Sequence, residues 1–121
     1  MEILGIGTDI INQSRIEGVW RRFGQRFIER ILHPLEAERL TTLLSSKQSS
    51  YLAKRFAAKE AIAKALGTGI GSIKFKDIAI LNTKAGQPYI FSHHKALQNK
   101  ANMISLSDEA TIAIAFAIIY K

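Results

Sequence analysis

Large and small side chains alternate along the last strand that the sequence predicts, residues 110–120. Bulky groups stand at even positions, Ile112, Ile114, Phe116 and Ile118, and alanine stands at 113, 115 and 117. Successive side chains of a strand point to opposite faces, so one face carries bulk and the other only methyl groups. Such a strand suits a sheet covered on both faces. The layer over the methyl face must come very close, which an alanine-rich helix or a second subunit would allow.

The segment 49–66 predicts such a helix, with an apolar face, many alanines and Gly67 as its stop signal. The segment 2–11 predicts a buried strand that contains Gly5 and Gly7. Glycine inside a strand often marks the close approach of another backbone or of a ligand.

The remaining pattern predicts an α+β fold, because helices and strands do not alternate regularly. We expect a single domain, 1–121, in which a mainly antiparallel sheet packs against the long helix. Ser14 is expected to cap the first helix, which Gly24 breaks or bends, and a polar connection spans 45–50. The other expected elements are helices 14–31 and 34–44, strands within 74–92 around a turn at 85–88, a short helix 93–101, and strand 103–107.

Charge and composition limit the possible functions. The chain has 17 Lys and Arg against 10 Asp and Glu, a net charge of +7, which favours an acidic partner. It has no cysteine, so thiolate metal sites and cysteine nucleophiles are excluded. No signal peptide and no apolar run long enough to cross a membrane is recognisable. We therefore expect a cytoplasmic protein.

Three charged side chains are candidates for chemistry. Glu60 and Lys64 are one turn apart among alanines. They form either a stabilising surface pair or a place where a ligand approaches the helix. Asp9 stands in an apolar strand, where it either marks a turn or is paired or metal-bound. Two carboxylates, Asp9 and Glu60, would suit Mg²⁺, which completes its shell with water and phosphate oxygens.

Two further cationic features allow two interpretations each. Arg15, Arg22 and Arg26 form a basic flank on one helical face. This flank is either a solvated surface or a docking surface for an acidic helix or phosphates. Lys59 falls within the apolar face of its helix. Either its aliphatic stem runs past the core and carries the ammonium to solvent, or that face meets a polar layer.

Four segments together resemble the holo-acyl-carrier-protein synthases, the short bacterial type of phosphopantetheinyl transferase. They are GIGTDI, RFAAKEAIAKALGTGI, the turn GQP and SLSDEATIAIAFAII, which run from the first strand to the last. The resemblance implies an enzyme that moves the 4′-phosphopantetheine arm of coenzyme A onto a serine of apo acyl carrier protein, in support of fatty acid biosynthesis. Adenosine 3′,5′-bisphosphate is the other product. The resemblance also implies a Mg²⁺ requirement and a homotrimer with active sites between subunits. It implies no role for nucleic acid or membrane.

The resemblance also implies roles for individual residues. Asp9 and Glu60 would hold Mg²⁺, Lys64 would contact the phosphate under attack, and the serine proton would go to Glu60 or to a water on the metal. The implied coenzyme A contacts are Arg55 at the 3′-phosphate, Gly86 and Pro88 at the adenine, and Ser107 at the strand end. The arginines 15, 22 and 26 would then dock the acidic carrier, and the methyl face of the last strand would allow close subunit packing.

One position departs from the family pattern. Many members carry histidine where this chain has Asp108, and that histidine helps to bind the 3′-phosphate. We expect Asp108 to turn away or to be offset by nearby Lys and Arg, and leave it out of the site. The alternative functions are a basic nucleic-acid-binding protein, favoured only by the charge, and a non-catalytic trimeric scaffold.

Overall fold

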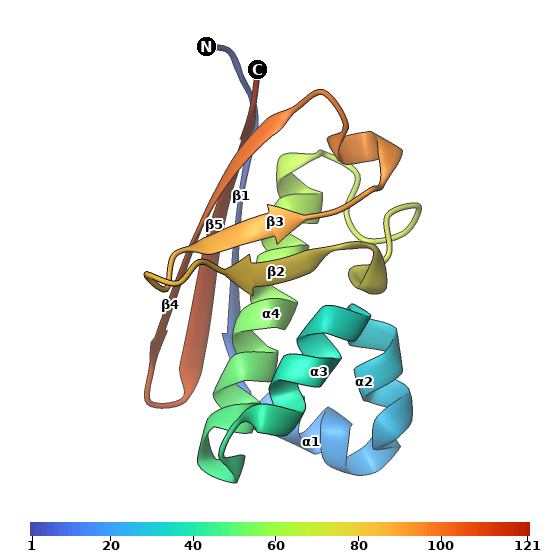
Figure 1. The fold of residues 1–121 in the computed structure, drawn as a ribbon, viewed down its shortest axis with the longest axis vertical. Coiled ribbons are helices and arrows are strands. Elements are labelled where there is room, and N and C mark those ends of the chain that lie inside the picture. The colour runs from blue at the N-terminus through green and yellow to red at the C-terminus, as the bar shows by residue number, and fades with distance from the viewer.

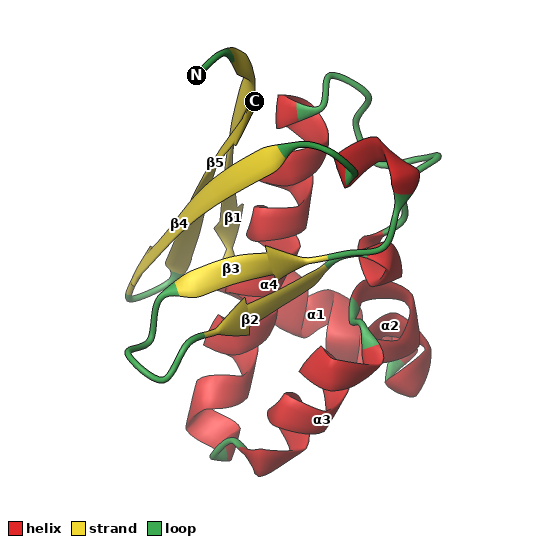
Figure 2. Cartoon of the chain, turned by 45° about the horizontal axis from the view of Figure 1, so that its top comes forward, coloured by secondary structure: helices red, strands yellow, loops and turns green.

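A long helix, α4 (Ser45–Ala65), lies between the two halves of the molecule in the computed structural model, which describes residues 1–121 (Figure 1). A three-stranded sheet covers one side of α4, and a hairpin with three shorter helices covers the other (Figure 2). The remaining elements are β1 (Ile3–Asn12), α1 (Gln13–Phe23), α2 (Gln25–Ile31), α3 (Pro34–Thr42), β2 (Ala79–Asn82), β3 (Pro88–Phe91), β4 (Ala101–Glu109) and β5 (Ile112–Tyr120). This is the predicted α+β architecture.

The larger sheet has the order β1-β5-β4, and both of its strand pairs are antiparallel. In this register the three alanines of β5 lie opposite Gly7, Asp9 and Ile11 of β1. All three alanines are fully buried under α4, whereas Ile112, Ile114 and Phe116 face away from it. The helix of the same chain, and not a second subunit, therefore covers the methyl face, so the expectation of subunit packing on that face is wrong.

The glycines of β1 allow the close approach of sheet and helix. A Cβ atom added to Gly5 would lie 1.9 Å from the carbonyl oxygen of Ala65, and one added to Gly7 would lie 1.9 Å from that of Ala61. Neither backbone could move without breaking the helix or the sheet. The glycines of β1 thus mark the close approach of another backbone, one of the two predicted alternatives.

A buried ion pair joins α4 to the elements on its other side. The Lys59 ammonium and the Glu36 carboxylate are both fully buried and in contact. Lys59 also donates to the Ile31 carbonyl at 2.7 Å, and Glu36 accepts from the backbone amide of Ile80 at 2.8 Å. Burial lowers the pKa of Lys59, against which Glu36 acts to raise it. Lys59 therefore meets a polar layer inside the core, one of the two predicted alternatives.

The break expected at Gly24 is confirmed, whereas two other local features were misassigned. Gly24, with a φ of +58°, divides the segment 14–31 into α1 and α2. The expected cap at Ser14 is wrong, since α1 begins at Gln13 and Ser14 only donates to the Asn12 side chain. Residues 45–50 are not a connection but the first turns of α4. Their serines are weak helix formers, so tertiary contacts of this segment decide its structure.

The predicted strand around Phe75 and the predicted helix 93–101 are each shorter than expected. Phe75–Asp77 is a turn of 3₁₀ helix in which Asp77 accepts from the amide of Lys74, and β2 starts only at Ala79. Within 93–101 only Lys95–Leu97 is 3₁₀ helical, and Asn99 has a φ of +60° that ends the turn before β4. None of the helices is both long enough and apolar enough to cross a bilayer.

Candidate active site

Strand β1 and helix α4 bring Asp9, Glu60 and Lys64 together. Asp9 lies opposite Ala115 in the sheet and therefore on the face that α4 covers. The Lys64 ammonium lies 3.1 Å from Asp9 Oδ1 and donates to the Thr8 carbonyl at 2.9 Å. The Asp9 side chain is 17% exposed and that of Lys64 is 51% exposed. The ion pair that the helix spacing suggested for Lys64 is thus made with the strand, not with Glu60.

Glu60 is the member of this cluster that has no direct partner. It forms no side-chain hydrogen bond and no ion pair. Burial raises its pKa, and the neighbouring Asp9 carboxylate raises it further, while Lys64 and Arg15 act in the opposite direction. A carboxylate held near a second carboxylate without a partner of its own is a site that would gain from an additional cation.

The donor chemistry of this pair fits Mg²⁺. Asp9 and Glu60 offer oxygen ligands, which hard divalent cations prefer. No third aspartate, glutamate or histidine joins them, since no group of three such side chains with metal-binding geometry exists in the chain. Mg²⁺ is commonly held by one or two carboxylates and keeps several waters or phosphate oxygens, so two ligands from the protein are sufficient.

Arg55 lies on a different side of α4. At 100° per residue it is about 140° from Glu60 and about 180° from Lys64 around the helix. Its guanidinium is buried, stacks 4.2 Å from the Tyr51 ring and donates from Nη2 to the Ile80 carbonyl at 3.1 Å and to Asn82 Oδ1. Its Nε has no partner. The guanidinium therefore retains donor capacity that its contacts within one chain do not use.

The turn between β2 and β3 lies beside Arg55. Gly86 has a φ of +93°, and its carbonyl accepts from the Asn82 side chain at 3.0 Å. Pro88 begins β3 opposite Asn82. The structure thus gathers Arg55, Gly86 and Pro88 into one region, and this region is separated by α4 from Asp9 and Lys64.

Ser107 and Asp108 lie on opposite faces of β4. Ser107 stands opposite Ile114 on the open face of the sheet, away from α4. Asp108 stands opposite Ala113 on the helix side, where it accepts from Ser50 Oγ at 2.9 Å and lies 3.4 Å from the Lys54 ammonium. The Ser50 hydrogen bond and the positive charge of Lys54 lower the pKa of Asp108. Its charge is therefore offset by a nearby lysine, as one of the two expectations required.

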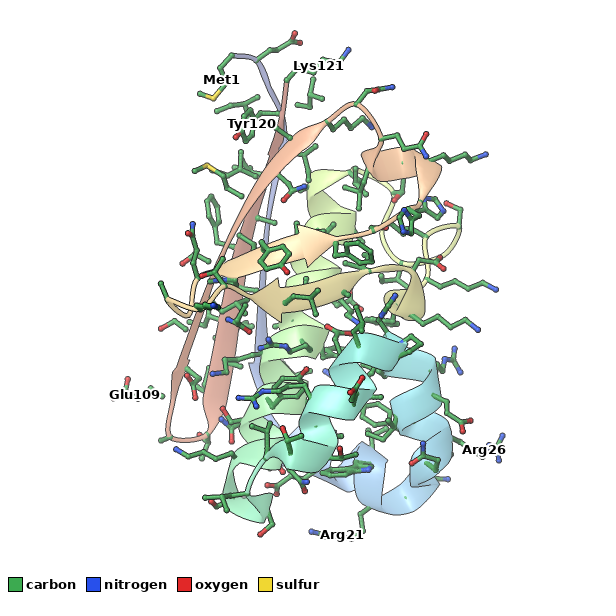
Figure 3. The ribbon with its side chains drawn as sticks, viewed as in Figure 1. Met1, Arg21, Arg26, Glu109, Tyr120 and Lys121 are labelled. Atoms are coloured by element: carbon green, nitrogen blue, oxygen red, sulfur yellow. The ribbon has the colours of Figure 1, made fainter.

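The three predicted docking arginines are exposed but do not share one helix. Arg15 and Arg22 lie on α1, while Arg26 lies on α2 beyond the break at Gly24, so the single helical face drawn for all three is wrong. Figure 3 shows the Arg26 side chain extending from α2 into solvent. Arg15 is near enough to Glu60 to lower its pKa, which places the start of α1 beside the carboxylates.

An open groove of ≈ 980 Å³ lies next to this basic surface. Aromatic side chains from four elements line it, Phe23, Phe27, Phe56 and Phe75, and Arg26, Arg30, Lys74 and Lys76 also border it. Phe23 is 47% exposed, and the Arg22 guanidinium lies 5.2 Å from its ring. The surface thus combines positive charge with an exposed apolar floor.

Sequence reasoning missed Asn82 and Glu36. Asn82 links Arg55 to the turn, and Glu36 is the partner of Lys59. Neither stands in a motif, and their partners are 27 and 23 residues away along the chain. The one available signal was the misplaced Lys59, which required an acidic partner in the core.

The comparisons with known proteins place the fold in a class of group-transfer enzymes. Residues 5–117 match the 4′-phosphopantetheinyl transferase superfamily, and the chain belongs to this family. It is similar to the holo-[acyl-carrier-protein] synthase of Ehrlichia canis, with 46% identity over 121 residues that cover 98% of this chain and 95% of the relative.

Two solved structures share the fold over nearly their full length. The holo-[acyl-carrier-protein] synthase of Bacillus anthracis, solved in complex with CoA (3′,5′-ADP), has a TM-score of 0.89 and 35% identity over 100% of this chain and 99% of its own. The synthase of Neisseria meningitidis has a TM-score of 0.89 and 42% identity over 98% of this chain and 99% of its own.

Proposed function

We propose that this chain transfers the 4′-phosphopantetheine arm of coenzyme A to a serine of apo acyl carrier protein. The serine oxygen forms a bond to the phosphorus that carries the pantetheine arm. The bond from that phosphorus to the bridging oxygen breaks, and adenosine 3′,5′-bisphosphate leaves. The observation that carries the proposal is the meeting of Asp9, Glu60 and Lys64 between β1 and α4, in a chain whose relatives are named for this reaction.

Asp9 and Glu60 would hold Mg²⁺ between them. The ion, when bound, neutralises negative charge on the pyrophosphate and orients it. The protein fixes the two carboxylates on rigid elements, since one stands on a paired strand and the other in the middle of α4. That rigidity keeps the oxygen ligands in place before the substrate arrives.

Lys64 and Glu60 have separate roles toward the reacting groups. The Lys64 ammonium, half in solvent at the edge of the cluster, would donate to the phosphate under attack and stabilise its developing charge. Asp9 is already engaged by Lys64, so Glu60 is the carboxylate of the cluster with no hydrogen bond of its own. It can therefore accept the serine proton, directly or through a water.

The proposed site is completed by a second copy of the chain. In one chain α4 separates Arg55, Gly86 and Pro88, the proposed nucleotide contacts, from the carboxylates, and Ser107 faces outward. The open face of the sheet carries an apolar patch that one chain leaves exposed, Ile6, Ile10, Met103, Ile112, Ile114 and Phe116. We therefore keep the homotrimer with active sites between subunits as part of the proposal.

Disruption of the apolar patch tests the assembly. Phe116→Arg places a charge on this face, and we expect loss of the trimer by light scattering together with loss of transfer. Leu44→Arg is the matched control, because Leu44 is 73% exposed and lies outside the sheet. A monomeric wild-type chain with full activity would refute the shared site.

The basic surface on α1 and α2 would receive the acidic carrier. Charge reversal by Arg22→Glu should raise KM for the carrier at least tenfold and leave KM for coenzyme A unchanged, since rim charges act mainly on association. Arg21→Glu is the control, because Arg21 does not line the groove and borders a separate hollow with Glu17 and Trp20. An equal effect of both variants would indicate only general electrostatic attraction.

Intact mass spectrometry tests the reaction itself. Apo carrier protein incubated with the chain, coenzyme A and Mg²⁺ should gain one phosphopantetheine arm, and EDTA should prevent the gain. Glu60→Gln should fold and be inactive. Absence of transfer to several carriers would favour the scaffold alternative.

We propose that residues 1–121 act as one catalytic domain, and that they work in the cytoplasm.

A further inference from the structure

The turn between β2 and β3 is held together mostly by its own backbone. The Thr83 amide donates to the Gln87 carbonyl at 2.9 Å, and the Gly86 amide donates to the Thr83 carbonyl at 2.9 Å. The Gln87 amide donates to Thr83 Oγ1 at 3.1 Å. Residues 82–87 are exposed, so no apolar packing fixes the turn against the rest of the molecule.

The side chain of Asn82 connects this turn to the core. Its Oδ1 accepts from Nη2 of Arg55, and its Nδ2 donates to the Gly86 carbonyl at 3.0 Å. An amide offers a donor and an acceptor at once, which neither a carboxylate nor an alanine can do. Asn82 also forms the last residue pair of the hairpin, with Pro88, where no further strand pairing follows.

The other end of this connection is rigid. The Arg55 guanidinium is fixed by the Ile80 carbonyl and by the Tyr51 ring, and the Tyr51 hydroxyl donates to the Glu36 carbonyl at 3.1 Å. Each of these groups is buried. Asn82 therefore transmits the position of a buried guanidinium to an exposed turn.

We propose that Asn82 is a positioning residue that sets the affinity for the nucleotide half of coenzyme A. The inference rests on the proposed function, in which Arg55 contacts the 3′-phosphate and the turn at Gly86 contacts the adenine. A turn already held in its binding conformation loses less conformational entropy when the ligand binds. Without the Asn82 bridge, the two contacts would no longer be held at a constant separation.

The test compares Asn82→Ala and Asn82→Asp with the wild type. Alanine removes both hydrogen bonds, and aspartate keeps the acceptor for Arg55 but loses the donor to Gly86. We expect both variants to raise KM and the calorimetric Kd for coenzyme A roughly tenfold, the worth of one to two hydrogen bonds. kcat and KM for the carrier should stay within about twofold of wild type. Thr83→Ser, which keeps the hydroxyl acceptor of the turn, is the matched control and should change nothing.

A second readout separates positioning from a general loss of structure. Removal of the 3′-phosphate should cost wild type more affinity than it costs Asn82→Ala, because the variant no longer holds the Arg55 region and the turn in register. The inference would be overturned if the ratio of the Kd values for coenzyme A and 3′-dephospho-coenzyme A were the same in wild type and in both Asn82 variants. A rise in both KM values together, or an unchanged Kd, would also overturn it. A wild-type chain that neither binds coenzyme A nor modifies the carrier would instead overturn the proposed function, and this inference with it.

Discussion

Two lysines of helix α4, only five residues apart, form ion pairs of opposite character. Lys59 pairs with Glu36 in the core, and both side chains are fully buried. Lys64 pairs with Asp9 at 3.1 Å, and half of its side chain is in solvent. The first pair also satisfies three backbone groups, the Ile31 carbonyl and the amides of His33 and Ile80. The second leaves the neighbouring Glu60 without a hydrogen bond or ion pair of its own.

The difference shows what each pair can do. A buried pair that is fully hydrogen-bonded cannot exchange partners, because either charge alone would be left without water. An exposed pair costs little to open, since water replaces the lost contact. Lys59 therefore organises the core under the helix, and Lys64 is the lysine that can change partners, as its proposed role requires.

The largest effect on stability is expected from breaking the buried pair. Lys59→Met should lower the free energy of unfolding by about 3–5 kcal/mol, because Glu36 remains as an uncompensated buried charge. Urea unfolding measures the change. Glu36→Gln added to this variant should recover part of the loss. Lys54→Met, which breaks the surface pair with Asp108, is the control and should cost less than about 1 kcal/mol. Similar losses for both lysines would contradict the comparison.

Lys64→Met is expected to separate activity from stability. The free energy of unfolding should fall by less than about 1 kcal/mol, because the pair is exposed. kcat for carrier modification should fall by roughly 10²–10³, as for loss of one donor to developing charge. Single-turnover kinetics and urea unfolding on the same preparations test both parts. A variant that keeps its activity would show that Lys64 is only a surface charge.

The smallest effect concerns Glu60 and sharpens the contrast with Glu36. Because the pKa of Glu60 is raised in the folded chain, the folded state holds a proton that the unfolded state releases. Stability contributed by this group therefore falls as pH rises from the ordinary glutamate pKa to the raised one. Glu60→Gln should abolish this slope and, above that window, stabilise the chain by less than about 1 kcal/mol after solvent screening. Urea unfolding in EDTA at several pH values measures it, and a variant less stable than wild type at neutral pH would contradict the assignment.

Much of the candidate site was predictable because its signals are local. Asp9 stands out in an apolar strand, and the spacing of Glu60 and Lys64 places them on one helical surface. The glycines of β1 predicted the close approach of a backbone or a ligand, and the structure shows that this backbone is α4. The prediction that Arg26 shares a helical face with Arg15 failed because it treated the segment as one continuous helix, whereas the helix ends at Gly24.

The sequence by itself determined the strand and the helix that carry Asp9, Glu60 and Lys64, the need for a closely packed layer, and the family to which the chain belongs. Periodicity and small residues encode these features within one element at a time. Only the tertiary structure decided that Lys59 pairs with Glu36, that Ser50 and Lys54 engage Asp108, and that Arg55 reaches the Gly86 turn through Asn82. These contacts join residues distant along the chain, and their partners are selected by burial and by the need to satisfy polar groups in the core, which no local pattern records.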